Sequence, residues 1–392
     1  MNRRLWMLTL CQGLFMINNV VFIAINGLVG LALAPSAWLA TLPITGYVAG
    51  GALASALVAQ HQRRYGRRRS FQFGLGVAML AALICATAAI TRNFWLLTAG
   101  TLLAGYYHAN ASLYRFASVE LVDGAHKERA ISWVLAGGIL GAVVGPNLAS
   151  GTRDLLTAPF AGAYLALVAV ALISLAVVSL IDFPPLPGQG EAAGARLGRP
   201  LGEIMRQPLF IAATACCAIG YGVMNLLMAA TPIAMAQCNH PFSSAALVLE
   251  WHVLGMFVPS FFTGHLIKRF GVIKVLVAGL LLEAGCVAFA LSGNDVMHFL
   301  GALFVLGVGW NFLYIGGTTL ATQSWTAQEK TRAQAALDFC VYLTMTVTSF
   351  SSGALVTTGG WTAMNQGSLV PLALLVVALW WARASQRDSV PT

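Results

Sequence analysis

The sequence predicts an all-α membrane protein. Hydrophobic residues make up 58% of its 392 residues, charged residues only 9%, and the mean hydropathy is +0.77. A soluble domain usually carries about 25% charged residues, so this chain cannot cover a globular surface in water. Its apolar residues form long runs rather than short alternating segments, which favours helical spans over barrel strands.

Twelve apolar runs are long enough to cross a bilayer, which takes about 20 helical residues. The first run resembles a signal peptide, but it is too long for a signal-peptide core and is interrupted by Asn18, Asn19 and Asn26. We therefore expect an uncleaved first span. The predicted spans are residues 6–34, 37–60, 70–91, 95–118, 129–150, 160–181, 207–230, 242–267, 272–291, 297–320, 334–357 and 366–384.

The distribution of Lys and Arg supports this span count. If both termini are cytoplasmic, 19 of the 22 basic residues fall in inner segments, and only Arg92 and Arg153 fall in outer loops. Arg115 lies inside a span. Cytoplasmic loops of membrane proteins are enriched in Lys and Arg, so the net charge of +9 indicates topology rather than nucleic-acid binding. We expect a multi-pass protein of the bacterial cytoplasmic (inner) membrane with both termini in the cytoplasm.

The chain divides into two similar halves. A segment rich in Pro, Gly and Ala, residues 182–206, predicts a cytoplasmic linker between six-span bundles at residues 1–181 and 207–392. "RRYGRRR" at Arg63 and "KRFGVIK" at Lys268 lie 205 positions apart, each between the second and third span of its half. Parallel repeats of six spans are the plan of one class of transporters.

These basic turns resemble the loop motif of the major facilitator superfamily, G-x-x-x-D-R-x-G-R-R, and the resemblance covers essentially the whole chain. The matching residues are Arg64, Gly66, Arg67 and Arg68 in the first copy and Gly264, Arg269 and Gly271 in the second. The Asp of the family is replaced by Arg63 and by Lys268. The contacts that this Asp makes in the family therefore cannot form here in the same way.

A second resemblance lies in the fifth span. "GGILGAVVGPNLASG" resembles the family's Gly-Pro motif through Gly141, Gly145 and Pro146, with Gly137 and Gly151 beside them. Small residues at every fourth position let helices pack closely, and a proline bends a helix. The family's Arg in the fourth span is absent, and Thr101 stands at that position.

The resemblance implies two pseudo-symmetric six-helix bundles around a central cavity lined by spans 1, 4, 7 and 10, in a functional monomer. Polar residues, which are costly in hydrocarbon, do gather in these spans. Tyr107, Asn110 and Tyr114 share one helical stripe, with His108 beside it. The candidates for substrate contact are Asn18, Asn19, Tyr107, His108, Asn110, Tyr114, Arg115, Tyr221, Asn225, Trp310, Asn311 and Tyr314.

Several of these residues have structural alternatives. Arg115 could hold an anionic group of the substrate, or could pair with Glu120 or reach the inner headgroups. His108 could contact substrate or hydrogen-bond a neighbouring helix. The aromatic residues of the fourth and tenth spans, such as Trp310, could stack on a planar substrate or serve in packing.

Three ionisable residues are candidates for proton coupling. Glu250 and His252 lie in the eighth span and Asp338 near the inner end of the eleventh. Buried carboxyl and imidazole groups can titrate near neutral pH and so carry protons. The alternatives are a helix contact or a solvated mouth for Glu250 and His252, and a salt bridge for Asp338. Glu283 is the one charged residue in a span expected to face lipid, and we expect it to turn inward or be protonated.

The sequence therefore predicts a secondary transporter of a small organic solute, driven by an ion gradient and coupled to protons. It contains no nucleotide-binding, GxSxG, HExxH or zinc-site pattern, and its seven cysteines fit buried apolar positions, so we expect no enzyme, cofactor or metal. A membrane enzyme using His108 or His252, and a transport-inactive sensor or scaffold, are the rival functions.

Direction is less constrained by the sequence. The Gly-Pro motif favours export by antiport. The altered loops and the missing Arg leave open import by proton symport of a nutrient or vitamin-like planar compound. "LYRFASVEL" and "RAISWVLAGG" resemble a bacterial branch that includes riboflavin-type importers.

Overall fold

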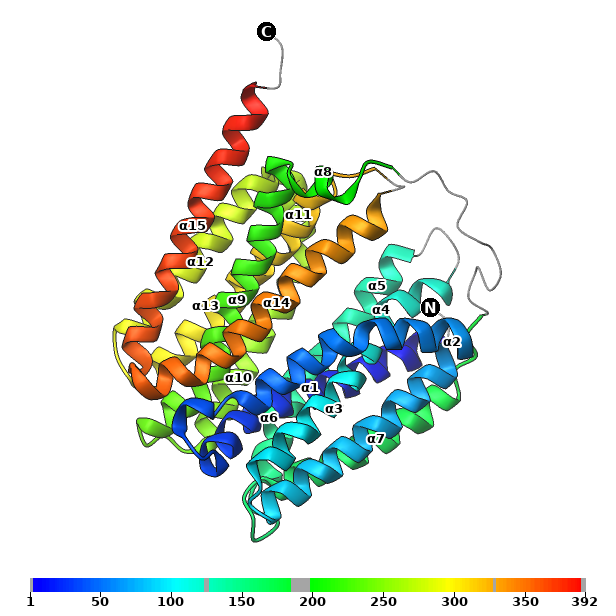
Figure 1. Ribbon diagram of the computed structural model, residues 1–392, viewed down its shortest axis with the longest axis vertical. Coiled ribbons are helices and arrows are strands. Elements are labelled where there is room, and N and C mark those ends of the chain that lie inside the picture. The colour runs from blue at the N-terminus through cyan, green and yellow to red at the C-terminus, as the bar shows by residue number, and fades with distance from the viewer. Residues whose placement is uncertain (1–2, 123–126, 185–197, 327–328, 389–392) are drawn as a thin grey trace.

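The computed structural model describes residues 3–122, 127–184, 198–326 and 329–388, and every regular element within these ranges is a helix (Figure 1). Part of the predicted linker lies outside the described residues. The elements are α1 (Arg3–Leu33), η1 (Ala37–Leu39), α2 (Leu42–Ile90), α3 (Phe94–Ala111), α4 (Tyr114–Glu120), α5 (Lys127–Ala136), α6 (Gly138–Thr152), α7 (Ala161–Ser179), α8 (Leu201–Met205), α9 (Pro208–Gln237), α10 (Phe242–Phe257), α11 (Ser260–Phe270), α12 (Val272–Leu291), α13 (Val296–Ala321), α14 (Lys330–Thr358) and α15 (Gly360–Asp388).

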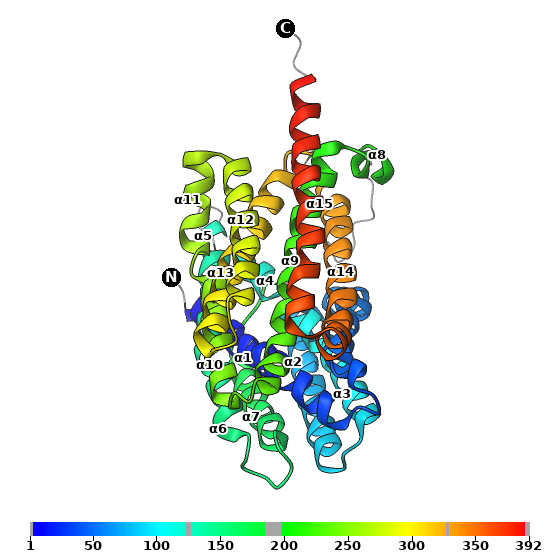
Figure 2. The ribbon, with the colours of Figure 1, turned by 90° about the vertical axis from the view of Figure 1, so that its left-hand side faces the viewer.

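The helices form two groups, which lie one beside the other in Figure 1 and overlap in the view of Figure 2, turned by 90°. We call α1 to α7 the N-half and α9 to α15 the C-half. We call the side that carries Gly66 and Gly271 the basic face, and the opposite side, with η1 and the α6–α7 loop, the far face. The basic face is the one that the sequence predicts to be cytoplasmic.

The described helices agree with twelve spans. Nine of these helices are long and apolar enough by themselves to cross a membrane, or ten if the bent pair α10 and α11 is counted as one span. One long helix, α2, contains two predicted spans because the chain turns at Gly66 without a loop. The fourth span is missed because it is broken into α3 and α4 and because His108 and Asn110 lower its hydropathy. The bent pair α10 and α11 forms the eighth span.

Three spans that the sequence predicts as continuous are broken. The fourth is interrupted at Ser112 and Leu113, the fifth at Gly137, and the eighth at Val258 and Pro259, where the helix bends by 42°. Pro259 cannot donate the backbone hydrogen bond that would continue α10. Ser112 instead donates its hydroxyl to the carbonyl of Ala109, a local bond that competes with the helix.

The two basic turns adopt the same backbone conformation. Gly66 has φ 77° and ψ 170°, and Gly271 has φ 87° and ψ 151°. Only glycine enters this region readily, because a Cβ atom would clash with the backbone. Each glycine therefore permits a tight turn between two spans.

Replacing Gly66 by Ala is therefore expected to lower the free energy of unfolding by about 1–3 kcal/mol, the usual cost of a side chain in such a conformation. The added Cβ would meet no atom within 4 Å, so the whole effect comes from the backbone. Thermal unfolding in detergent measures it. Gly367→Ala is the matched control, since Gly367 is helical and equally uncrowded, and this variant should be as stable as the parent or more so. Equal stability of both variants would contradict the prediction.

The helices of spans 3, 6, 9 and 12 present apolar side chains outward. Phe73 on α2, Leu172 on α7, Leu281 on α12 and Trp380 on α15 are all more than half exposed. In a bilayer, large exposed apolar side chains on parallel helices are what lipid contact requires. Glu283 on α12 does turn inward and is fully buried against α13.

The end of the linker is fixed to the C-half by one ion pair. Arg199 donates from Nε and Nη2 to Glu329 at 2.9 and 2.8 Å, and the backbone N–H of Thr326 donates to the same carboxylate. Arg332 adds a hydrogen bond to the carbonyl of Arg199. The hydrogen bonds from Arg199 and Thr326 hold the pKa of Glu329 well below its usual range.

This low pKa predicts how linker docking depends on pH. A carboxylate with a depressed pKa stabilises the docked state above its ordinary pKa, about 4.3, and loses that contribution as pH falls through the lower value. Hydrogen-exchange protection of residues 198–206, corrected for intrinsic rates, should stay constant from about pH 8 to 5 and fall below about pH 4. Glu329→Gln should weaken protection at neutral pH and remove the dependence. Acid loss that persists unchanged in this variant would overturn the assignment.

The halves are joined at the far face. Thr41, at the start of α2, accepts a hydrogen bond from the N–H of Gly353 on α14 at 2.9 Å. Asn147 on α6 donates to Glu250 on α10 at 3.0 Å. The ring of Phe160, before α7, meets that of Phe242 edge-on at 4.9 Å. The structure is therefore closed at the far face, and in Figure 1 the two groups diverge toward the basic face.

Candidate functional site

Three aromatic side chains of the C-half form one cluster. The rings of Trp310 and Tyr314, one turn apart on α13, stack with centroids 5.2 Å apart and an angle of 8°. Tyr221 on α9 meets both edge-on, at 5.2 and 5.5 Å. The indole N–H of Trp310 is buried and has no hydrogen-bond acceptor among the described residues. The cluster thus combines flat apolar surface with an unused donor.

Arg115 of the N-half faces this cluster. Its charge acts on Tyr221 and Tyr314, and also on Asp338 and Tyr342 of α14. Its Nε atom is buried without an acceptor among the described residues. It therefore provides a cation and a free donor between the two halves.

The alternative partner expected for Arg115 is already engaged. Glu120 binds Arg67 through two hydrogen bonds, of 3.2 and 2.6 Å, at the basic face. Glu120 is therefore not available as the counter-charge of Arg115. This favours a role for Arg115 across the interface between the halves.

Tyr47 on α2 completes the set from the N-half, and sequence reasoning missed it. Its ring stacks on Phe22 at 5.1 Å and meets His108 at 5.0 Å, and its hydroxyl lies 3.2 Å from Nδ1 of His108. It also lies near Tyr221 and Tyr342 of the C-half. The available signal was a single hydroxyl-bearing ring within an otherwise small and apolar stretch, "ITGYVAGG". We call Tyr47, Arg115, Tyr221, Trp310, Tyr314, Asp338 and Tyr342 the central cluster.

Three asparagines among the candidates are engaged in joining helices. Asn110 donates to the carbonyl and hydroxyl of Ser70, which ties α3 to α2. Asn225 ties α9 to α14 through three acceptors at 2.8–3.1 Å. Asn311 donates to the carbonyl of Met256 and accepts from Thr263, bridging the break between α10 and α11. The amide N–H groups of these side chains are thus engaged within one half, although Oδ1 of Asn110 has no partner among the described residues.

The remaining candidates in spans 1 and 4 lie inside the N-half. Tyr107 and Tyr114 are buried in its core beside Phe15 and Phe71. Asn18 is buried with its Oδ1 unpaired among the described residues, and Asn19 is half-buried. The stripe of Tyr107, Asn110 and Tyr114 therefore packs inward, whereas His108 beside it reaches Tyr47.

The coupling candidates lie apart from one another. Glu250 meets Asn147 across the two halves, and Asp338 faces Arg115. His252 is fully buried, and its Nδ1 donates to the carbonyl of Leu303 at 2.6 Å, which leaves Nε2 unpaired among the described residues. Glu283 is also fully buried, with both carboxylate oxygens unpaired there. The chain thus holds several protonatable groups at membrane depth rather than one relay.

The basic turn of the N-half is held by ion pairs despite the missing Asp. Arg67 binds Glu120, and Arg68 lies 3.4 Å from Asp182 and donates to the carbonyl of Ser179. In the C-half turn, Arg269 lies over the ring of Phe270 at 5.2 Å. Ion pairs of Arg67 and Arg68, four and five residues after the position of the family's Asp, therefore fix the first turn to its own half.

The glycines of the fifth span pack against α1. A Cβ atom at Gly141 would lie 2.3 Å from the Cβ atom of Met16, and one at Gly145 would lie 3.0 Å from that of Val20. Pro146 lies inside α6. This is the close packing that the small-residue pattern predicts.

Comparison with known proteins agrees with this architecture. The family model described as Major Facilitator Superfamily matches residues 5–249 and 213–392. The chain is 40% identical to the riboflavin transporter RfnT of Brucella anthropi over 96% of this chain and 95% of that one. It is 27% identical to the uncharacterized MFS-type transporter YddS of Bacillus subtilis, over 89% and 84%.

Among solved structures, a bacterial metal transporter superposes with a TM-score of 0.69 over 97% of this chain and 99% of that one. Its sequence is only 14% identical, so this likeness concerns the fold alone. Within the described residues, no cluster of His, Cys, Asp and Glu could hold a metal ion.

Proposed function

The chain belongs to the major facilitator superfamily, and we propose that it carries a planar, ring-containing solute of the riboflavin type across the membrane by alternating access. The observation that carries this proposal is the central cluster. Flat aromatic rings from α9 and α13 lie beside two buried donors, on Trp310 and Arg115, that have no acceptor in the described part of the chain. A flat heterocycle with carbonyl oxygens offers both the ring face and the acceptors that this arrangement lacks.

The 40% identity to a riboflavin transporter over nearly the full length supports the same solute class. The test is uptake of riboflavin into sealed vesicles that contain the purified protein. Ribitol is the control solute, because it keeps the sugar-alcohol chain of riboflavin and lacks its ring system. Flux of riboflavin without flux of ribitol is expected, and equal flux of both would refute the assignment.

Proton coupling is part of the proposal. Glu250, His252 and Asp338 are protonatable groups within the spans, and Asp338 faces the one cation of the central cluster. Flux should therefore respond to an imposed pH gradient, and Glu250→Gln, His252→Asn or Asp338→Asn should weaken that response. If flux ignored both the gradient and all three replacements, coupling by these residues would be excluded.

Export by antiport is a second candidate, favoured by the Gly-Pro motif on α6 and its close packing against α1. The sign of the gradient separates the two modes in the same vesicles. A symporter accumulates riboflavin when the outside is acidic, and an antiporter accumulates it when the inside is acidic. The import mode matches a nutrient or vitamin-like substrate.

A further inference from the structure

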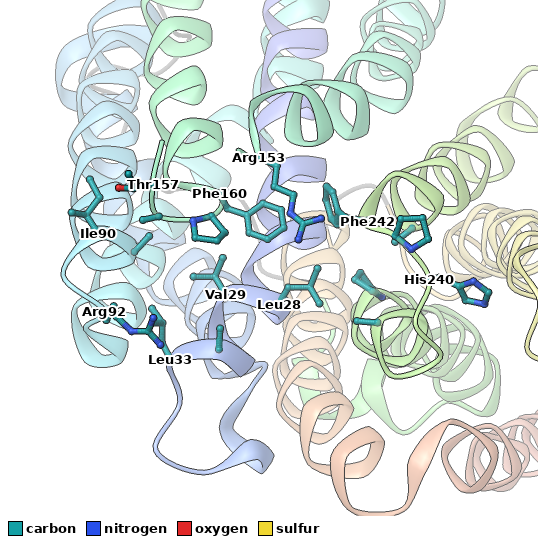
Figure 3. Close-up of a pocket in the computed structure, with 18 residues that line it drawn as sticks. Leu28, Val29, Leu33, Ile90, Arg92, Arg153, Thr157, Phe160, His240 and Phe242 are labelled. Atoms are coloured by element: carbon teal, nitrogen blue, oxygen red, sulfur yellow. The ribbon is translucent and has the colours of Figure 1, made fainter. Parts of the chain in front are cut away.

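A cavity of about 600 Å³ opens at the far face, away from the central cluster, and both halves line it (Figure 3). The N-half contributes the end of α1, the turn after α2 and the loop before α7. The C-half contributes the end of α9, the turn after it and the start of α10. Sites for small organic molecules usually have volumes of about 300–1,000 Å³, so the space suits such a ligand.

The charge of this cavity is unusual for its side of the membrane. Arg92 and Arg153 are the two basic residues that the sequence places in outer loops, and both line the cavity. No Asp or Glu is among its described lining residues. Lys and Arg are depleted in outer loops, so two arginines in one cavity indicate an anionic occupant.

Arg153 lies at the middle of the cavity with donors to spare. Its guanidinium lies 5.3 Å from the ring of Phe160 and 5.9 Å from that of Phe242, and Figure 3 shows it between the two. Its Nε forms an ion pair with Oδ1 of the exposed Asp154 at 3.6 Å, but has no hydrogen-bond acceptor among the described residues. Arg92, at the other end of the cavity near Leu33, is exposed.

The backbone around the cavity is strained. The non-glycine residues with positive φ in the described chain are Arg92 at 55°, Phe160 at 64° and Asn239 at 61°. Arg92 and Phe160 line the cavity, and Asn239 directly precedes His240, which also lines it. Such conformations persist where the surrounding structure imposes them, and they concentrate at functional sites.

We propose that this cavity binds an organic phosphate, a phosphate group on an apolar body, and that the occupant holds the far face closed. The phosphate would accept hydrogen bonds from Arg153, with Arg92 adding favourable charge, and the apolar body would pack on Phe160, Phe242 and the aliphatic end of α1. Because the walls come from both halves, the site exists only while the halves are together here. A ligand that binds one state alone shifts the population toward that state.

Binding is tested on the purified full chain in nanodiscs of phosphatidylcholine, with 1-naphthyl phosphate as the probe and 1-naphthol as its uncharged analogue. The phosphate should bind about tenfold more tightly than the naphthol, as expected for charge-assisted hydrogen bonds. Arg153→Gln and Arg92→Gln should each reduce that preference. Arg206→Gln, which removes an exposed cation near the basic face, is the matched control and should leave it unchanged.

If the phosphate bound no better than the naphthol, or if all three variants bound it equally, the site would be refuted. Adding phosphatidylglycerol to the nanodisc distinguishes a lipid phosphate from a free organic phosphate as the natural occupant. Competition with the probe in the parent chain but not in Arg153→Gln would assign the site to a lipid headgroup. Lack of competition would assign it to a free solute.

The closing effect has its own readout. Spin labels at Leu155→Cys and Met297→Cys, two exposed positions near the far face in different halves, report the distance between the halves. The background carries Cys238→Ser and Cys340→Ser, which removes the two cysteines that are not buried. The probe should raise the share of short distances in the parent chain and not in Arg153→Gln. An unchanged distribution in the parent chain would refute the closing role. Neither experiment depends on transport, so both stand whether or not riboflavin is the solute.

Discussion

Arg115→Gln is expected to reduce solute flux by about tenfold or more, because a cation within a membrane span usually serves function, and 1.4 kcal/mol is about tenfold. The variant keeps the length of the side chain but removes the cation that acts on Asp338 and on the tyrosines of the C-half. It leaves the carboxylate without its counter-charge. Initial rates of flux in vesicles measure the effect.

Three further variants test whether the loss of flux comes from the charge of Arg115 and from its interaction with Asp338. Arg115→Lys keeps the charge and should retain part of the flux. The double variant Arg115→Gln with Asp338→Asn should lose less than the product of the two single losses, because the second change removes a group that already lacks its partner. Arg206→Gln controls for loss of a cation elsewhere. If the loss of flux in the double variant equalled the product of the two single losses, the two residues would act independently.

Trp310→Ala is expected to raise the KM for a planar solute by about tenfold or more, because stacking on an aromatic side chain contributes roughly 1–3 kcal/mol per ring system. The indole is the centre of the cluster, since it contacts both Tyr314 and Tyr221. Tyr314→Phe keeps the ring and should change KM little. Concentration-dependent flux in vesicles measures all three proteins.

A control for folding is available on the outer surface. Trp380 on α15 is 70% exposed, and Trp380→Ala removes the same group from a position that would face lipid. Its KM should match that of the parent chain. If Trp310→Ala and Trp380→Ala behaved alike, the central cluster would not be the contact site for the solute.

The sequence predicted most of the fold because membrane architecture is encoded locally. A span needs a run of about 20 apolar residues, and a basic loop marks one side of the membrane, so both features can be read without knowing any distant contact. The turns at Gly66 and Gly271 were predictable for the same reason, as was the inward turn of Glu283. The breaks at Gly137 and Pro259 were not anticipated, because apolar content continues through them.

The candidate site was only partly predictable. Composition and the family resemblance identified Tyr221, Trp310, Tyr314 and Arg115. They could not separate these residues from Asn110, Asn225 and Asn311, whose hydrogen bonds join helices. Which way a polar side chain turns depends on the rotation of its helix against its neighbours, and the spacing along one helix does not fix that rotation.

The sequence by itself determined that this protein is a helical membrane transporter built from two repeats, with its basic turns on one face. Only the tertiary structure decided that Tyr47 joins the central cluster and that Glu120 pairs with Arg67 rather than with Arg115. It also decided that Arg92 and Arg153 line the same cavity. The physical reason is the range of the interactions. Partition between lipid and water acts on each segment separately, whereas a binding site forms only where side chains from distant segments are brought together by packing.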